Sequence, residues 1–171
     1  MSDHNGLLPG GLFPDVDLDD HAGNHRRLSD LVAGDPMLVH FYRGWWCPKE
    51  QAFFRTLVDL QSEAEVAYTR FVSISVDAPE VEAAFRAGIG ARWTFLSDAE
   101  RTWLGRLGLA ETTDSSHRPY LPTVFTLDPD LRIHAAYNGY WYWGRPTSEE
   151  LRQDFRAISR RIRADWEPPR S

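Results

Sequence analysis

Apolar residues along the chain gather in short runs that are typical of β-strands. Residues 37–42 are almost continuously apolar, which suits a strand buried on both faces of a parallel sheet, and residues 71–76 predict a second buried strand. Residues 122–127 predict a later strand, and a tight turn at 128–130 joins it to its expected hairpin partner at 131–137. The shorter expected elements are a strand at 93–96 and an early hairpin that turns at Gly23-Asn24.

Helical periodicity fills the stretches between these strands. Apolar positions within residues 53–60 fall on one face of a helix. Asp77 is expected to cap the start of the next helix with its carboxylate, and residues 97–107 predict another. Residues 147–150 read as a capping box, so they predict the start of a last amphipathic helix over residues 151–162.

The order of these elements defines the fold class. Strands alternate with helices before a closing hairpin, which predicts parallel strands joined by right-handed crossovers. The expected fold is therefore α/β, with a central mixed sheet flanked by helices and an N-terminal β-hairpin extension. One domain is expected over residues 12–164, between a flexible N-terminal arm at 1–11 and a C-terminal tail at 165–171.

Composition narrows the classes of partner. The net charge is -6, and general nucleic-acid binding needs a surplus of Lys and Arg, so no nucleic acid is expected as a partner. No apolar run approaches the roughly 20 residues of a membrane helix, and the first eleven residues lack the pattern of a signal peptide. The single cysteine cannot form an internal disulfide, so nothing points to an oxidising compartment. We therefore expect a cytoplasmic protein with no membrane partner.

Cys47 is the main candidate for chemistry. It follows a buried strand and precedes a helix whose first residue is Pro48, so its thiol is expected to face unpaired backbone N–H groups and the positive end of the helix dipole. Arg43 and Lys49 add positive charge, whereas Glu50 partly cancels it. Two interpretations stay open: a reactive thiolate, which this placement favours, and a small buried hydrophobic residue, which is a common fate of a free cysteine.

The segment around Cys47 resembles the strand–loop–helix of the redoxin group of thioredoxin-fold proteins. This group includes alkyl hydroperoxide reductases, thiol-specific antioxidants and peroxiredoxin-like proteins. Residues 39–50 carry the strongest likeness, and the order and spacing of the other landmarks support it. These landmarks are residues 13–15, 28–31, 73–77, 94–98 and 122–128. The resemblance implies a thioredoxin-like fold over about residues 12–160.

The sequence departs from the family motifs at several positions. A thioredoxin CxxC pair would need a cysteine where Glu50 stands, and the peroxiredoxin motif PxxxTxxC would need proline and threonine where His40 and Gly44 stand. The family's active-site arginine has no direct counterpart, and Arg43 or Arg118 is the candidate to replace it, although either could be a solvated surface charge.

The resemblance also implies which residues surround the thiol. Pro122 is similar to the cis-proline of thioredoxin-like folds, and a cis bond there would expose the backbone of Leu121 to a docking partner. The sequence alone also permits an ordinary trans proline at a strand start, and the resemblance favours cis. The aromatic segment 137–146 is expected to lie near the same end of the sheet, as a wall around the thiol, a dimer interface or plain core. The complete set of expected substrate-binding residues is Tyr42, Gly44, Trp45, Trp46, Leu121, Pro122, Trp141 and Trp143.

Two histidines add open alternatives. His40 could act as a base near the thiol or be a satisfied core residue, and His117 could reach the site or stay on the surface. No spacing of His, Cys and Asp suggests a metal site, and no cofactor is expected.

The resulting hypothesis is a single-cysteine oxidoreductase of peroxiredoxin-like type. Cys47 would attack a hydroperoxide to give a sulfenic acid, and an external thiol reductant would restore it because the chain has no resolving cysteine. Two alternatives remain: a non-catalytic thioredoxin-fold module that binds a partner through its aromatic surface, and a thiol transferase that forms a mixed disulfide with a small thiol. A homodimer is possible in each case.

Overall fold

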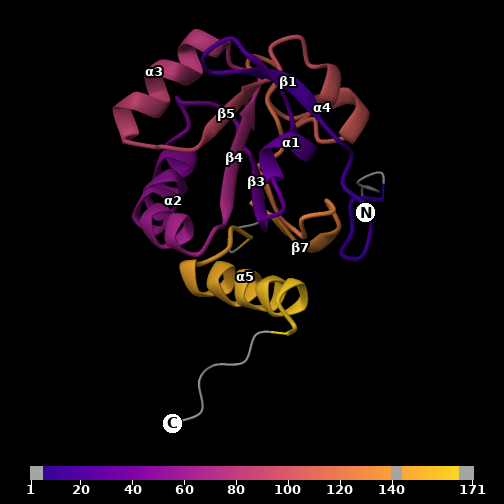
Figure 1. Ribbon diagram of the computed structural model, residues 1–171. Helices are drawn as coiled ribbons and strands as arrows, with labels where there is room; N and C mark the ends of the chain where they lie inside the picture. Colours follow the sequence, from indigo (N-terminus) through magenta and orange to yellow (C-terminus); the bar gives the residue numbers. More distant parts are fainter. Residues whose placement is uncertain (1–5, 140–143, 166–171) are drawn as a thin grey trace.

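A single sheet organises the computed structural model, which describes residues 6–139 and 144–165 (Figure 1). Its strands are β1 (Asp17–Asp20), β2 (His25–Arg27), β3 (Met37–Phe41), β4 (Arg70–Ser75), β5 (Thr94–Ser97), β6 (Thr123–Leu127) and β7 (Ile133–Asn138). They form a seven-stranded sheet in the order β2-β1-β5-β4-β3-β6-β7. β3, β4 and β5 are parallel, and the other pairs are antiparallel, so the predicted mixed α/β sheet is confirmed.

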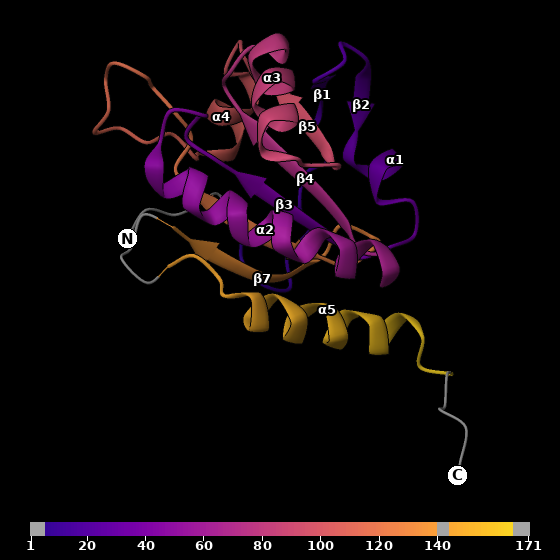
Figure 2. The ribbon, with the colours of Figure 1, turned by 90° about the vertical axis from the view of Figure 1, so that its left-hand side faces the viewer.

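Helices cover both faces of this sheet. They are α1 (Leu28–Val32), α2 (Pro48–Val66), α3 (Pro79–Ile89), α4 (Thr102–Leu107) and α5 (Ser148–Ile162). Side chains of α2, α3 and α5 join one apolar cluster, and side chains of α1 and α4 join the other. Figure 2 shows α2 and α5 running along the same side of the sheet.

Strand β3 is buried on both faces, as its apolar run predicts. Each of its residues is at most 1% exposed. Leu38 belongs to the cluster under α2 and α5, whereas Val39 belongs to the opposite cluster, because neighbouring side chains of a strand point to opposite faces. His40 therefore lies on the α2 side of the sheet, which is the side of Cys47.

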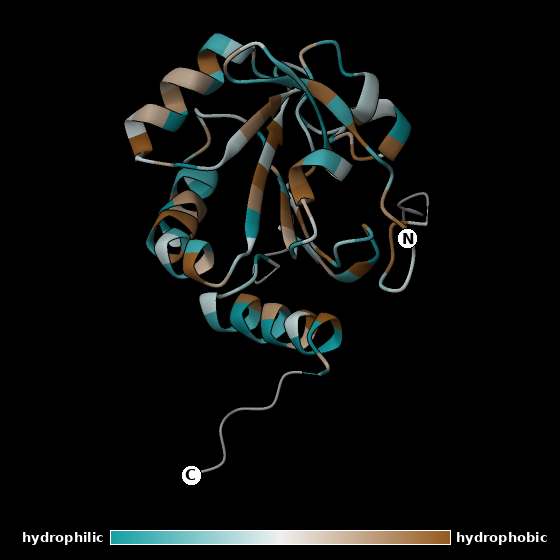
Figure 3. Cartoon of the chain, viewed as in Figure 1, coloured by the Kyte–Doolittle hydropathy of each residue, from teal (hydrophilic) through white to brown (hydrophobic). Residues whose placement is uncertain are grey.

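The helices of the described residues are amphipathic rather than apolar throughout. Figure 3 shows hydrophilic and hydrophobic positions alternating around α5, while the middle of the central strands is hydrophobic. None of the helices in the described ranges has the length and apolarity needed to cross a membrane.

The N-terminal part of the chain is tied to the domain more closely than expected. The hairpin β1–β2 is present and its Asp19 and Asp20 pair with β5, which confirms the predicted extension. Within the segment expected to be a flexible arm, Leu7 is buried and Gly10 N donates to Ile133 O at 2.8 Å. Burial of this apolar side chain and pairing of this backbone group attach residues 6–11 to the start of β7.

The start of α3 differs from the sequence prediction. Pro79 occupies the first helical position, so the N-cap is Ala78 and not Asp77. Asp77 instead accepts a hydrogen bond from Trp45 N at 3.2 Å. The carboxylate that was expected to cap a helix therefore holds the loop beside Cys47.

Candidate active site

Cys47 is the N-cap residue of α2, at the point where the loop after β3 enters the helix. Pro48 follows at the first helical position, and Cys47 N donates to Gly44 O at 3.2 Å, which closes the loop into a turn. The N–H groups of the first helical turn have no acceptor within the helix, so this end of α2 can stabilise negative charge that develops on the sulfur. The residue is only 3% exposed.

Glu50, one turn into α2, is fully buried beneath this loop. Its carboxylate accepts hydrogen bonds from Arg43 N at 3.0 Å and from Arg145 Nε at 3.1 Å, with a further bond from Arg145 Nη2. His40 Nε2 lies 3.5 Å from the same carboxylate. Burial raises the pKa of Glu50, but His40 and Arg145 outweigh it and hold the pKa below its ordinary value. Glu50 was expected to weaken the positive field at Cys47, and its charge is instead neutralised by Arg145.

Arg145 was not singled out in the sequence and is the arginine that the fold brings to this site. It follows β7 and reaches back across 95 sequence positions to Glu50. The Nη1 group of Arg145 donates to Gly139 O at 3.1 Å. The side chain of Arg145 also packs against Gly139, so a Cβ atom added to this glycine would lie 2.9 Å from Arg145 Cγ. The available signal was a lone arginine in an otherwise aromatic segment with a glycine six residues earlier.

Arg43 is engaged in a different contact from the one expected. Its Nη2 donates to Asp114 Oδ2 at 2.8 Å and lies 3.6 Å from Glu111. Its guanidinium also stacks over the Trp46 ring at 5.1 Å. Arg43 therefore ties the loop of Cys47 to the loop that contains Asp114, while its buried Nε finds no partner among the described residues.

His117 also joins this contact between the two loops, which lie side by side in Figure 2. Its ring stacks on Trp46 with centroids 3.8 Å apart, and its Nδ1 lies 2.9 Å from Asp114 Oδ2. The hydrogen bond from His117 N holds the pKa of Asp114 below its usual range, so a carboxylate charge is kept between His117 and Arg43. Of the two alternatives for His117, the structure supports the one that brings it to the site.

Gly44 occupies the position of the family threonine, and the structure shows why no side chain fits there. Its φ is +154°, and a Cβ atom would overlap Nε1 of Trp46. The indole of Trp46 thus fills the space that a threonine side chain would need.

The other expected site residues are dispersed. Tyr42 is fully buried and donates to Glu82 Oε2 at 3.1 Å, so it belongs to the core and not to a substrate surface. Trp45 is 49% exposed beside Cys47. Arg118 is exposed, at the far end of the loop that contains Asp114. Trp141 and Trp143 lie outside the described residues.

The expected cis bond before Pro122 is absent, since every described peptide bond is trans. The trans segment lets Leu121 N donate to Leu109 O at 2.7 Å and lets Pro122 O accept from Gly139 N at 2.7 Å. This stretch continues the line of β6 and pairs on both sides, so the backbone of Leu121 is not exposed for docking. No three side chains of His, Cys, Asp or Glu in residues 6–139 and 144–165 cluster in a way that could hold a metal ion.

Comparison with known proteins decides the family. The AhpC/TSA family profile matches residues 9–136. The chain belongs to the AhpC/TSA family. A Mycobacterium tuberculosis protein (strain CDC 1551 / Oshkosh) named as a peroxiredoxin is 33% identical over 131 residues, which cover 74% of this chain and 82% of the relative. The resemblance carried by residues 39–50 and the later landmarks is therefore confirmed.

Solved structures confirm that this AhpC/TSA chain has the thioredoxin-like fold of peroxiredoxins. Peroxidoxin BcpB from M. tuberculosis superposes with a TM-score of 0.76 at 22% identity, over 90% of this chain and 97% of the other. AhpC from Enterococcus faecalis gives 0.75 at 16% identity, over 95% and 99%. A yeast mitochondrial 1-Cys peroxiredoxin gives 0.76 at 17% identity, over 95% and 84%.

Proposed function

We propose that this AhpC/TSA chain is a thiol-dependent peroxidase of the peroxiredoxin kind, with Cys47 as its single redox centre. The observation that carries the proposal is the position of Cys47 at the N-terminus of α2, close to a buried Glu50 whose charge Arg145 neutralises and whose carboxylate lies 3.5 Å from His40 Nε2. A carboxylate left uncompensated there would oppose a thiolate, whereas the neutralised group leaves the helix end free to stabilise one.

The reaction follows from this thiolate. The sulfur attacks the terminal oxygen of a hydroperoxide, the O–O bond breaks, and Cys47 becomes a sulfenic acid while the leaving oxygen takes a proton to give an alcohol or water. A first external thiol then forms a mixed disulfide with Cys47 and releases water. A second thiol attacks that mixed disulfide, restores Cys47 and leaves as an external disulfide. Two external thiols are needed because the chain has one cysteine.

Access to the sulfur governs this chemistry. Because Cys47 is 3% exposed, a peroxide reaches its sulfur only when the structure around it shifts. The contacts of Trp46 with Gly44, Arg43 and His117 oppose that shift, so they set how readily the site opens. The closed loop would in turn shield the sulfenic acid from a second oxidation.

The decisive experiment is direct oxidation of Cys47. One equivalent of hydrogen peroxide should add one oxygen to the intact protein, and dimedone should trap that adduct on Cys47. The dimedone step is required because the chain also holds two methionines, whose sulfoxides have the same added mass but do not react with dimedone. Cys47→Ser is the matched control and should give no adduct.

A second candidate is favoured by the same burial. A sealed Cys47 fits a non-catalytic module in which the thiol is a small core residue. Absence of the dimedone adduct at stoichiometric peroxide, together with unchanged behaviour of Cys47→Ser, would replace the peroxidase with this module. A thiol transferase would instead show a mixed disulfide with a small thiol and no peroxide consumption.

Several finer points of the proposal concern partners. The substrate is a peroxide or a small thiol, and the reductant is an external thiol. The cytoplasmic location, the homodimer and the roles of Arg118, Trp141 and Trp143 stay predictions. Sedimentation of the intact chain across a concentration series would test the homodimer.

A further inference from the structure

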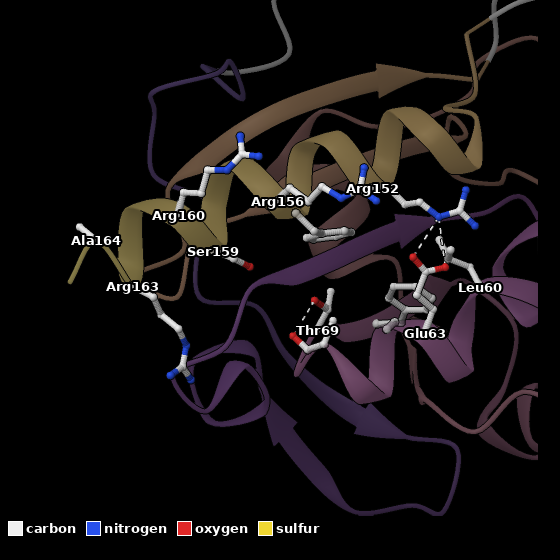
Figure 4. Close-up of a pocket in the computed structure, with 13 residues that line it drawn as sticks. Leu60, Glu63, Thr69, Arg152, Arg156, Ser159, Arg160, Arg163 and Ala164 are labelled. Carbon is white, nitrogen blue, oxygen red and sulfur yellow. Dashed lines mark hydrogen bonds and ion pairs between the residues drawn. The ribbon is translucent and has the colours of Figure 1, made fainter. Parts of the chain in front are cut away.

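A groove separates α5 from the C-terminal part of α2 and the start of β4 (Figure 4). Its volume is about 500 Å³, which lies within the range of small-molecule sites. Leu60 of α2 begins its wall thirteen residues after Cys47, so the groove lies about 20 Å along the helix from the thiol. It is therefore separate from the candidate active site.

The floor of the groove is apolar. Leu60 and Ala64 of α2, Phe71 of β4 and Phe155 of α5 form it. Leu60, Phe71 and Phe155 belong to the core cluster between α2, α5 and the sheet, so the floor is anchored in the interior. A ligand resting on this floor would bury alkyl surface against a preformed wall, without any need to reorder it.

The rim of the groove carries the opposite charge to the rest of the molecule. Four arginines of α5 and the turn after it line the groove, against one acidic residue, Glu63. The whole chain has a net charge of -6. This concentration of cations beside an apolar floor is complementary to an anion with an apolar body.

The arginines are not equivalent along the groove. Arg152 reaches across to Glu63 with distances of 3.0 and 3.1 Å, as Figure 4 shows, and Arg156 lies 3.4 Å from Glu149. Within the described part of the chain, Arg160 and Arg163 form neither an ion pair nor a hydrogen bond through their side chains. One end of the groove is thus closed by an ion pair. At the other end, the guanidinium groups of Arg160 and Arg163 point to opposite sides of α5, and that of Arg163 lies on the side of the groove, without a partner among residues 6–139 and 144–165 (Figure 4).

We infer that this groove binds one long-chain fatty-acid anion, with its carboxylate at Arg163 and its alkyl chain along the floor toward Leu60. Guanidinium groups pair with a carboxylate through two parallel hydrogen bonds, which suits a head group held at the open end. A single alkyl chain matches a groove that is elongated and apolar on one side. The inference is independent of the peroxidase proposal, because none of the groove residues contacts Cys47.

Calorimetric titration with dodecanoate, below its micelle concentration, tests the inference. Dodecanoate should bind with a stoichiometry of one. Burial of each methylene contributes up to about fourfold in affinity, so octanoate should bind at least about tenfold more weakly. Dodecyltrimethylammonium has the same chain with the opposite charge and should not bind. Cys47→Ser should bind dodecanoate like the parent chain, which separates this result from failure of the peroxidase proposal.

Matched variants locate the site. Arg163→Gln should weaken dodecanoate binding about fivefold. Arg161→Gln removes the same charge from the same helix, but Arg161 pairs with Asp128 outside the groove, so affinity should stay within about twofold. Ala67→Trp should fill the groove and abolish dodecanoate binding. Val66 is 82% exposed and does not line the groove, so Val66→Trp should leave dodecanoate binding unchanged.

Three outcomes of these titrations would overturn the inference. They are the absence of binding heat up to about 1 mM dodecanoate, equal binding of dodecyltrimethylammonium, and an equal response of the groove variants and their controls. Binding to anionic vesicles without binding to dodecanoate would also refute it, since the surface would then recognise a membrane and not a single chain.

Discussion

Glu50 is buried with its charge because several groups face it at once. Arg145 and His40 supply positive or polarisable partners, and Arg43 N occupies another lone pair of the carboxylate. A buried ion pair is costly to desolvate. When only one of its two partners is removed, the other is left as an unpaired charge in the interior. The same contacts draw the segment after β7 toward the helix that carries Cys47.

The first prediction therefore concerns Arg145→Met. Loss of the guanidinium should lower the free energy of unfolding by about 3–5 kcal/mol, because Glu50 stays buried without its main counter-charge. The double variant Glu50→Gln/Arg145→Met should lose less than the sum of the single variants. Urea unfolding followed by tryptophan fluorescence measures both quantities.

Arg161→Met is the control for Arg145→Met. Arg161 is half-exposed in its pair with Asp128, and breaking an ion pair with such an exposed member costs at most about 1 kcal/mol. An equal decrease in the free energy of unfolding for the two methionine variants would show that the buried pair of Glu50 and Arg145 stabilises the fold no more than a surface ion pair.

The second prediction concerns Gly44, whose missing side chain leaves room for Trp46. Gly44→Ala should lower the free energy of unfolding by about 1–3 kcal/mol, since the added methyl group meets the indole and the backbone lies at positive φ. Gly105→Ala is the matched control: no atom lies within 4 Å of its added Cβ and the residue is helical, so the same change should be neutral or stabilise by about 0.5–1 kcal/mol. A stability gain for both alanines would contradict the packing argument.

At the scale of elements, α5 depends on a defined N-terminus. Thr147 Oγ1 accepts from Glu150 N at 3.1 Å, and Glu150 reaches back to Thr147 N at 3.1 Å, which confirms the capping box predicted at 147–150. This cap begins two residues after Arg145, so it fixes the backbone on which the guanidinium is carried.

The third prediction tests this cap. Thr147→Ala should cost about 1 kcal/mol of stability, and Thr147→Ser should restore most of it, because the hydroxyl is what satisfies the helix N–H group. Ser148→Ala alters the neighbouring hydroxyl, which caps nothing, and should leave stability within about 0.5 kcal/mol. Urea midpoints give the comparison, and an effect of Ser148→Ala as large as that of Thr147→Ala would refute the cap.

Elements with local signals were predictable from the sequence. β3 was marked by a continuous apolar run, α5 by its capping box, and the hairpin β1–β2 by its turn at Gly23-Asn24. The capping role of Asp77 was wrong because Pro79 shifted the start of α3 by one residue. In each of these cases the decisive interactions lie within a few positions of one another.

The candidate site was predictable only in part for the opposite reason. Cys47 is marked by its own neighbours in the sequence. The pairs Arg145–Glu50 and Arg43–Asp114 join residues 95 and 71 positions apart, and no spacing rule foretells which of many charged residues will meet. The backbone pairing of Leu121 and Pro122 with Leu109 and Gly139 likewise joins segments that only the folded sheet brings together.

At the scale of the whole molecule, two buried carboxyl groups respond to pH in opposite ways. Glu50 faces Arg145 and His40, so its pKa lies below the ordinary value. Burial raises the pKa of Glu82 well above the ordinary value, because its nearest partners are the hydroxyls of Ser75 and Tyr42 and not cations, and Asp77 adds negative charge. Glu50 therefore contributes stability that is lost as pH falls through its folded-state pKa, below about 4.3.

Glu82 gives the last prediction, at the other side of the pH range. Above about pH 4.3 the unfolded chain ionises this group while the folded chain keeps its proton, so the folded state binds more protons and stability falls as pH rises. Each unit by which folding raises the pKa of Glu82 lowers the free energy of unfolding at high pH by up to about 1.4 kcal/mol.

The free energy of unfolding, measured with urea at pH 5 and pH 8, should fall over this interval. Glu82→Gln should reduce the fall because glutamine has no proton to lose. Glu80→Gln, at an exposed position of the same helix, should leave the fall unchanged. A fall that is equally large in Glu82→Gln would mean that Glu82 is already ionised in the folded protein, and the cation that neutralises it would then have to come from outside the cluster of Tyr42, Ser75 and Asp77.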